Sequence, residues 1–168
     1  PWKGLQEKLQ GIRQRELVVA TSGTGQGKSS IMRELATHLL NKGERVGYVA
    51  LEESNRRTAL GLMSVACGKQ FHIGKHEKED LKDAFVNTMA DWNLYLFDGF
   101  GSFDPDNIIS RIRYLAVGLD CKVVFLDHLS ILLSGLEGDE RKMIDTTMTR
   151  LRSLVEETGI TLFLVSHL

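Results

Sequence analysis

Residues 22–30 of the chain read SGTGQGKSS, and this stretch decides the fold. The apolar run from Leu17 to Thr21 precedes it, and an apolar stripe of helical spacing follows it from Ile31 to Leu40. Glycines let backbone N–H groups turn toward one anion, and the N-terminus of a following helix adds a partial positive charge. The stretch therefore predicts a phosphate-binding loop between a strand and a helix.

The side chains of this loop indicate how a nucleotide would be held. Lys28 supplies a positive charge for the β- and γ-phosphates, and the Ser29 hydroxyl is placed to coordinate Mg²⁺. The usual motif begins with glycine, and here Ser22 takes that position, which shapes the turn and does not contact phosphate. The residues that we expect to bind the nucleotide are Ser22, Gly23, Thr24, Gly25, Gln26, Gly27, Lys28, Ser29 and Ser30.

Further apolar runs along the chain predict a parallel sheet. They span residues 45–51, 94–97, 122–127 and 160–165, and they are rich in Val, Ile, Leu and Phe without polar alternation. This pattern is typical of strands that are covered on both faces. Helical stripes lie between the runs, one of them opened by Asp104 as N-cap and Pro105 at the first helical position. We expect an α/β fold, mostly parallel, with helices on both faces of the sheet and a surface loop entering a helix over residues 67–80.

Composition excludes several classes of protein. The 168 residues carry 21 basic and 22 acidic side chains, so the positive field of a general nucleic-acid-binding domain is absent. Two cysteines are too few for a disulfide framework and favour a reducing compartment. The sequence has no apolar run near the roughly 20 residues that cross a membrane, and no signal peptide. We expect a soluble cytoplasmic domain without a membrane partner.

Polar residues follow the predicted strands, at the sheet edge where nucleotides bind. Asp127 follows four apolar residues and has the form of a carboxylate that holds hydrated Mg²⁺. Glu52 is a candidate general base for the attacking water, with Glu53 beside it. His167 could bind the γ-phosphate and report its presence, whereas the sequence assigns His128 no role.

Two other groups of residues favour ordinary structural roles. Cys67, His72 and His76 have a spacing reminiscent of a zinc site, but no fourth ligand is clearly placed nearby. The basic pairs at residues 141–142 and at positions 150 and 152 are typical of a solvated helix face, although a DNA-binding stripe is the alternative.

Taken in order, five segments resemble a known family: GLQEKLQGIRQREL, TSGTGQGKSS, VGYVALEES, KVVFLDHLSIL and TLFLVSHL. Their sequence is similar to the RecA-like core of ring-shaped replicative helicases. Within that group it looks most like the helicase half of the primase–helicases of T-odd bacteriophages. The bacterial DnaB helicases and mitochondrial Twinkle are more distant. The resemblance runs from about Gly4 to the last residue.

The resemblance implies a RecA-like P-loop NTPase that hydrolyses Mg²⁺–NTP, with ATP or another NTP or dNTP as substrate. It implies that the free energy of NTP hydrolysis drives translocation on single-stranded DNA and duplex unwinding. The protein would act as a homo-hexamer in which each nucleotide lies between subunits, and other replication proteins are possible partners. Lys28 and Ser29 would bind phosphate and Mg²⁺, Asp127 would be the Mg²⁺-associated acid, Glu52 the base and His167 the γ-phosphate sensor. The last strand would lie between the phosphate-loop strand and the Asp127 strand.

In the family, a DNA-binding loop, further strands and an arginine finger follow the segment that ends here at Leu168. We therefore expect residues 1–168 to form a single RecA-like domain, truncated at its C-terminal end and nearly inactive when isolated from a longer protein. Two other functions stay open: a RecA-type recombinase or regulatory P-loop ATPase without unwinding activity, and a non-catalytic nucleotide-binding module.

Overall fold

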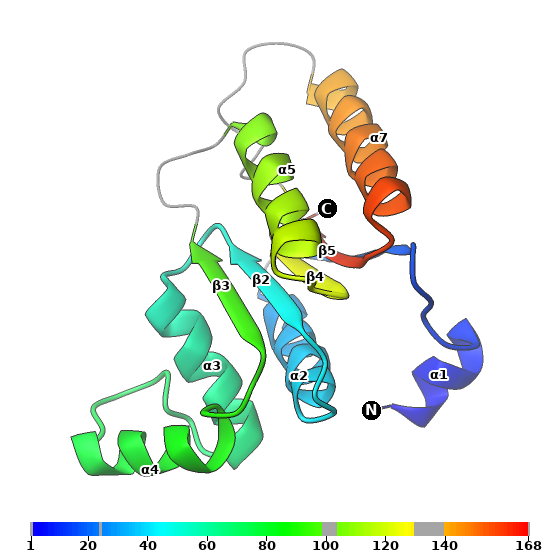
Figure 1. Cartoon of the computed structure of the whole chain (residues 1–168). Helices are drawn as coiled ribbons and strands as arrows, with labels where there is room; N and C mark the ends of the chain where they lie inside the picture. Colours follow the sequence, from blue (N-terminus) through cyan, green and yellow to red (C-terminus); the bar gives the residue numbers. More distant parts are fainter. Residues whose placement is uncertain (1, 24, 99–103, 130–139, 168) are drawn as a thin grey trace.

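The computed structural model of the chain describes residues 2–23, 25–98, 104–129 and 140–167, and the side chains of Glu140 and His167 lie outside this description. Within these ranges, five parallel strands form one sheet in the order β1-β5-β4-β2-β3 (Figure 1). The strands are β1 (Leu17–Ser22), β2 (Val46–Ala50), β3 (Leu94–Asp98), β4 (Val123–Asp127) and β5 (Thr161–His167). The helices are α1 (Lys3–Leu9), α2 (Lys28–Leu40), α3 (Asn55–Cys67), α4 (Lys78–Thr88), α5 (Pro105–Arg113), the π-helical turn η1 (Tyr114–Gly118) and α7 (Glu140–Thr158).

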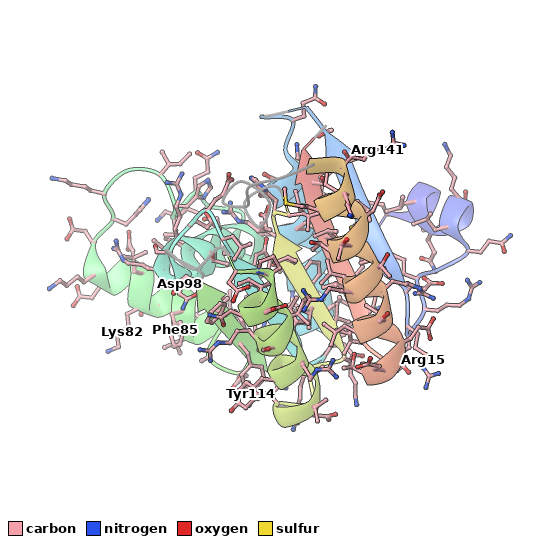
Figure 2. The ribbon with its side chains drawn as sticks, turned by 90° about the horizontal axis from the view of Figure 1, so that it is seen from above. Arg15, Lys82, Phe85, Asp98, Tyr114 and Arg141 are labelled. Atoms are coloured by element: carbon pink, nitrogen blue, oxygen red, sulfur yellow. The ribbon has the colours of Figure 1, made fainter. Side chains whose placement is uncertain are left out.

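Helices cover both faces of the sheet, as the unbroken apolar strands predict. Helices α5 and α7 pack on one face, and Figure 2 shows them side by side from above, with Arg141 near the start of α7 and Tyr114 where α5 ends. Helices α2 and α3 pack on the other face. Successive residues of a strand point to opposite faces, so Val124 and Leu126 face α5 and α7, whereas Phe125 lies in the core with α2.

A row of aromatic rings crosses the sheet on the α2 face. Phe125 of β4 stacks on Tyr48 of β2 and on Phe163 of β5, with ring centroids 5.5 and 4.8 Å apart. The three residues are register partners in neighbouring strands. Stacked pairs of this kind add to the stabilisation from burial, so the central strands are held in register by their side chains as well as by the backbone.

The expected strands are confirmed, with bounds that shift by one or two residues. Asp104 caps α5 by accepting a hydrogen bond from the Asp106 N–H at 3.0 Å, and Pro105 is the first helical residue. The expected loop after Cys67 is also confirmed, and it enters α4 at Lys78. The sequence did not predict helices α1 and α3. The buried face of α3 includes the polar or small residues Thr58, Gly61 and Ser64, which weaken its apolar stripe. Helix α1 buries none of its residues, so it has no apolar stripe to identify it.

Strand order places the polar strand ends together. Strand β5 lies between β1 and β4, as the resemblance implies. Ala50 of β2 is the register partner of Asp127 in β4, and Ser22 of β1 is the partner of His167 in β5. Because all strands run parallel, their carboxyl ends form one edge of the sheet, where ligands bind in open α/β folds. Among the described helices, none has the length and apolar character of a membrane span.

Candidate nucleotide-binding site

The predicted phosphate loop connects the end of β1 at Ser22 with the start of α2 at Lys28. Gly25 and Gly27 adopt left-handed φ angles of 77° and 81°, which a residue with a Cβ reaches only with strain. Gly27 is the N-cap of α2 and has no side chain to cap the helix. The first N–H groups of α2 therefore point at a ligand site, an arrangement suited to an anion.

Lys28 folds back over the loop that precedes it. Its ammonium nitrogen Nζ donates hydrogen bonds to the carbonyls of Ser22 and Gly23, at 2.7 and 2.8 Å, and lies 3.2 Å from the Ser22 hydroxyl. The residue is only 7% exposed. The loop carbonyls thus hold the positive charge at the mouth of the loop, where an incoming phosphate would compete for it.

Ser29 and Asp127 lie together and are the residues that could hold a cation. Asp127 ends β4 and is 8% exposed, and this burial raises the pKa of its carboxyl group, an effect that the hydrogen bond with the Ser29 side chain partly offsets. A neighbouring cation would favour the ionised carboxylate. Mg²⁺ uses one or two protein oxygens and completes its shell with water and phosphate oxygens. A hydroxyl and a carboxylate at this edge fit that pattern.

The two glutamates after β2 have different surroundings. Glu53 accepts hydrogen bonds from Arg33 and Thr58 and is largely buried, with 16% of its side chain exposed. The Glu52 side chain is 57% exposed, and its Oε1 lies 2.5 Å from Nε2 of His128. Glu53 is therefore engaged by Arg33 and Thr58, whereas Glu52 lines the pocket beside the phosphate loop.

These groups converge on one pocket of about 250 Å³ beside the phosphate loop. Its lining consists of Gly25, Gln26, Gly27, Lys28, Ser29, Ser30, Glu52, Asp127, His128 and Val165. A second hollow of about 220 Å³ shares Ser29, Glu52 and Asp127 with it. The structure therefore brings the predicted phosphate, cation and base residues to a common space, although they come from three separate parts of the chain.

Two predicted site residues can be placed only in part. Thr24 lies outside the described residues. His167 ends β5 opposite Ser22, so its backbone lies next to the phosphate loop, but its side chain lies outside the description. His128, to which sequence reasoning gave no role, lines the pocket and contacts Glu52. The sequence signal that could have found it is its position directly after Asp127 at a strand end.

The histidines and basic residues away from the pocket have local contacts. His72 Nδ1 lies 3.0 Å from the Ser64 hydroxyl, and His76 Nε2 lies 2.8 Å from the carbonyl of Ile73. On α7, Arg150 pairs with Asp106 of α5, and Arg152 pairs with Glu156. These contacts agree with the structural interpretation of both groups.

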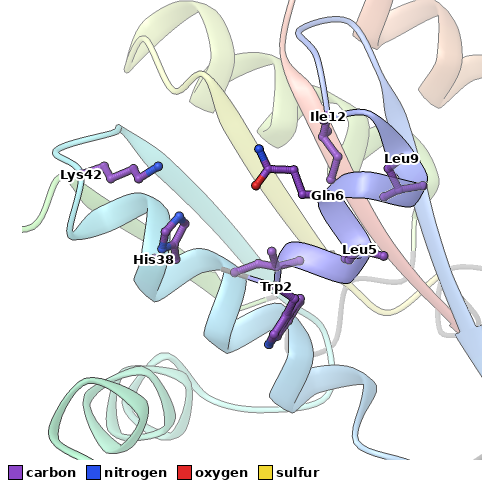
Figure 3. A pocket seen from close by; sticks show the side chains of 9 residues that line it. Trp2, Leu5, Gln6, Leu9, Ile12, His38 and Lys42 are labelled. Atoms are coloured by element: carbon purple, nitrogen blue, oxygen red, sulfur yellow. The ribbon is translucent and has the colours of Figure 1, made fainter.

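Two larger hollows lie beneath α1. One of about 290 Å³ is bordered by Trp2 of the N-terminal segment, by His38 of α2 and by Lys42 in the turn after α2 (Figure 3). The other, about 680 Å³, is lined mainly by apolar side chains of α1, β1 and α2, such as Leu9 and Ile31. Neither lining contains the phosphate loop or a strand-end carboxylate, so the smaller pocket beside the loop is the candidate nucleotide site.

Fold and loop together define a RecA-like P-loop NTPase domain. Two solved structures share this fold: an ATPase domain (TM-score 0.77, 16% identity, 98% of this chain and 61% of that one) and a KaiC-like protein from Pyrococcus horikoshii OT3 (TM-score 0.67, 24% identity, 94% of this chain and 65% of that one). Residues 2–168 match the DnaB-like helicase C-terminal domain, and the chain belongs to that family.

A relative in a bacteriophage is similar across the whole domain. The DNA helicase/primase of Enterobacteria phage T3 is 35% identical over 174 residues, which cover 99% of this chain. The chain spans 31% of the length of that relative.

Proposed function

We propose that this domain is the motor of a replicative DNA helicase, which hydrolyses Mg²⁺–NTP to drive translocation on single-stranded DNA and duplex unwinding. The observation that carries the proposal is the convergence of Lys28, Ser29, Asp127 and Glu52 on one pocket. Membership of the DnaB-like family and the similarity to a phage helicase/primase support it.

Phosphate binding in this proposal follows from the loop. The N–H groups at the start of α2 and the Lys28 ammonium hold the β- and γ-phosphates, with Gly25 and Gly27 giving the backbone its turn. Ser29 and Asp127 hold the cation. When bound, Mg²⁺ neutralises charge that develops on the phosphate oxygens during transfer. ATP or another NTP or dNTP would fit, because these contacts involve only the phosphates.

Hydrolysis needs a base for the attacking water, and Glu52 takes that role. Water oxygen bonds to the γ-phosphorus as the bond to the β–γ bridging oxygen breaks, and the water proton passes to the Glu52 carboxylate. Nucleoside diphosphate and phosphate are the products. We propose His167 as the γ-phosphate sensor, because its backbone lies beside the phosphate loop at the end of β5.

The family implies a homo-hexameric ring with single-stranded DNA as its track, an arginine finger from a neighbouring subunit, and other replication proteins as partners. Phosphate release by the full-length protein, with and without single-stranded DNA, together with unwinding of a forked duplex, tests this proposal. Unwinding with DNA-stimulated hydrolysis is expected. Strand exchange without unwinding would support the recombinase alternative, and nucleotide binding without turnover would support a binding module.

A further inference from the structure

Glu53 connects the end of β2 to two helices. Its Oε1 and Oε2 lie 2.7 and 2.8 Å from Nη2 of Arg33 on α2, and Oε1 accepts a hydrogen bond of 2.9 Å from the Thr58 hydroxyl on α3. The Arg33 and Glu53 side chains are only 12% and 16% exposed. A charge-assisted contact in such a shielded place is stronger and more rigid than one at the surface.

The same helix carries the phosphate loop and Arg33. Ser29 lies in the first turn of α2, and Arg33 lies four residues later, on the same side of the helix. Glu53 follows Glu52 directly in the chain. A short path of contacts therefore runs from the phosphate-binding end of α2, through Arg33 and Glu53, to the backbone that carries the proposed base.

Glu52 depends on such support because its own side chain is loosely packed. More than half of it is exposed, and its carboxylate contacts His128. The backbone before it is fixed, since the Leu51 N–H donates to the carbonyl of Asp127 at 2.8 Å. The backbone after it is fixed by Glu53. The next anchors along the chain are at residues 54 and 55, where Ser54 caps α3 and the Asn55 N–H donates to Asp98 at 3.1 Å, so Glu53 is the side-chain anchor adjacent to Glu52.

Gly61 of α3 makes room for this arrangement. A Cβ at position 61 would lie 2.6 Å from both Cζ and Nε of Arg33, closer than real atoms approach. An alanine would therefore displace the guanidinium, which is the movable end of a long side chain, without removing any charged group of the network. The crossing of α2 and α3 is thus shaped around Arg33.

We propose that Arg33 is a positioning residue for hydrolysis: by holding Glu53, it fixes the Glu52 carboxylate over the pocket formed by Ser29 and Asp127. This inference rests on the proposed function, in which Glu52 activates the water. Arg33 acts through Glu53 and touches no reacting atom. A misplacement of about 1 Å in such a constellation can lower the rate about 100-fold, so a lost contact at Glu53 is enough to matter.

Two variants of the full-length protein test the inference, Glu53→Gln and Gly61→Ala. For each, we expect kcat for nucleotide hydrolysis with single-stranded DNA to fall about 10- to 100-fold, while nucleotide affinity stays within about threefold. Alanine is favoured over glycine inside a helix, which offsets part of the stability lost with the disturbed Arg33–Glu53 contact, so Gly61→Ala is expected to stay folded with a modestly lower thermal midpoint. Fluorescent-nucleotide titration, steady-state kinetics and thermal unfolding supply the three readouts.

Each substitution has a matched control, in which the same change is made at a position away from the proposed site. Glu157→Gln breaks an exposed ion pair with Arg113, and Gly4→Ala adds a Cβ that meets no atom within 4 Å, so both should leave kcat unchanged. Glu52→Gln in parallel separates the two proposals. If Glu52→Gln loses turnover while Glu53→Gln and Gly61→Ala keep it, the positioning role is wrong and the base assignment stands. Normal turnover by Glu52→Gln overturns both proposals. If Glu53→Gln and Gly61→Ala lose nucleotide affinity to the same degree as kcat, Arg33 has a merely structural role.

Discussion

The backbone N–H of Leu51 donates a hydrogen bond of 2.8 Å to the carbonyl of Asp127. This bond continues the pairing of β2 with β4 one residue beyond the last register pair, Ala50 and Asp127. It ties the segment that carries Glu52 to the residue that we assign to Mg²⁺. The spacing between the proposed base and the proposed cation site is therefore set by the backbone of β2 and β4, which both have paired strands on each side.

Lys28→Ala should weaken the binding of Mg²⁺–nucleotide by about 10- to 100-fold, because hydrogen bonds to a charged partner are worth about 1.5 to 3 kcal/mol. Among the described residues that line the pocket, Lys28 and His128 are the basic ones. Fluorescent-nucleotide titration measures the effect. Lys69→Ala is the control, since Lys69 pairs with Asp80 on the surface. Equal affinity of both variants would place the phosphate site elsewhere.

Glu52→Gln should keep nucleotide affinity within about threefold and lower hydrolysis about 100- to 10,000-fold, the range that general bases contribute. The amide keeps the size of the side chain and can still contact His128, but it cannot accept the proton of the attacking water. Single-turnover phosphate release by the full-length protein measures this loss. Wild-type turnover would mean that the base lies elsewhere, and the buried contacts of Glu53 make it a poor replacement.

The parts of the site that were predictable from sequence are local ones. The phosphate loop is continuous, and its glycines, Lys28 and Ser29 have roles that depend on a strand before and a helix after. The apolar runs end in Glu52 and Asp127, and parallel strands bring such ends together at one edge. The resemblance implied that the last strand lies between the phosphate-loop strand and the Asp127 strand, and the structure confirms that position.

The remaining features depend on how distant segments pack. Sequence reasoning chose Glu52 as the candidate base, and only the Arg33 and Thr58 contacts show that its neighbour Glu53 is engaged in packing. The sequence does not distinguish Arg33 from other basic residues on helices. Its role becomes visible only in the structure, where α3 packs against α2 and Gly61 leaves room for the Arg33 guanidinium. Helix α3 itself escaped prediction because its buried face is partly polar, which weakens the apolar period that identifies helices.

Gly27→Ala should weaken nucleotide binding and destabilise the fold by about 1 to 2 kcal/mol, because the left-handed φ of 81° is strained for any residue with a Cβ. Gly43→Ala is the matched control. Gly43 has a φ of 83° in the turn after α2, and a Cβ there meets no atom within 4 Å. Urea unfolding should show similar losses for both variants, whereas only Gly27→Ala should lose nucleotide affinity. If both variants lost nucleotide affinity, the weaker binding would reflect the lower stability of the fold and not the geometry of the phosphate loop.

The two cysteines should differ sharply in reactivity. Cys67, at the end of α3, is exposed, and Cys121 is 1% exposed within the core beneath α5 and α7. Burial raises the pKa of the Cys121 thiol from an ordinary value of 9.0 to about 11. Since the thiolate is the reactive form, a maleimide or disulfide reagent at pH 8 should label Cys67 within minutes and Cys121 only on unfolding. Mass spectrometry of labelled peptides identifies the reactive cysteine, and rapid labelling of Cys121 in the folded protein would contradict its placement in the core.

The raised pKa of Cys121 also predicts a pH dependence of stability. The folded protein holds this thiol in its protonated form, whereas the unfolded thiol ionises from about pH 9 upward. Its contribution to the free energy of unfolding is therefore complete below about pH 9 and is lost as the pH rises toward 11. Urea titrations at pH 8 and pH 10 measure the slope, and Cys121→Ala should reduce it, whereas Cys67→Ala should not. An equal slope in the wild type and in Cys121→Ala would mean that other groups carry the alkaline loss of stability.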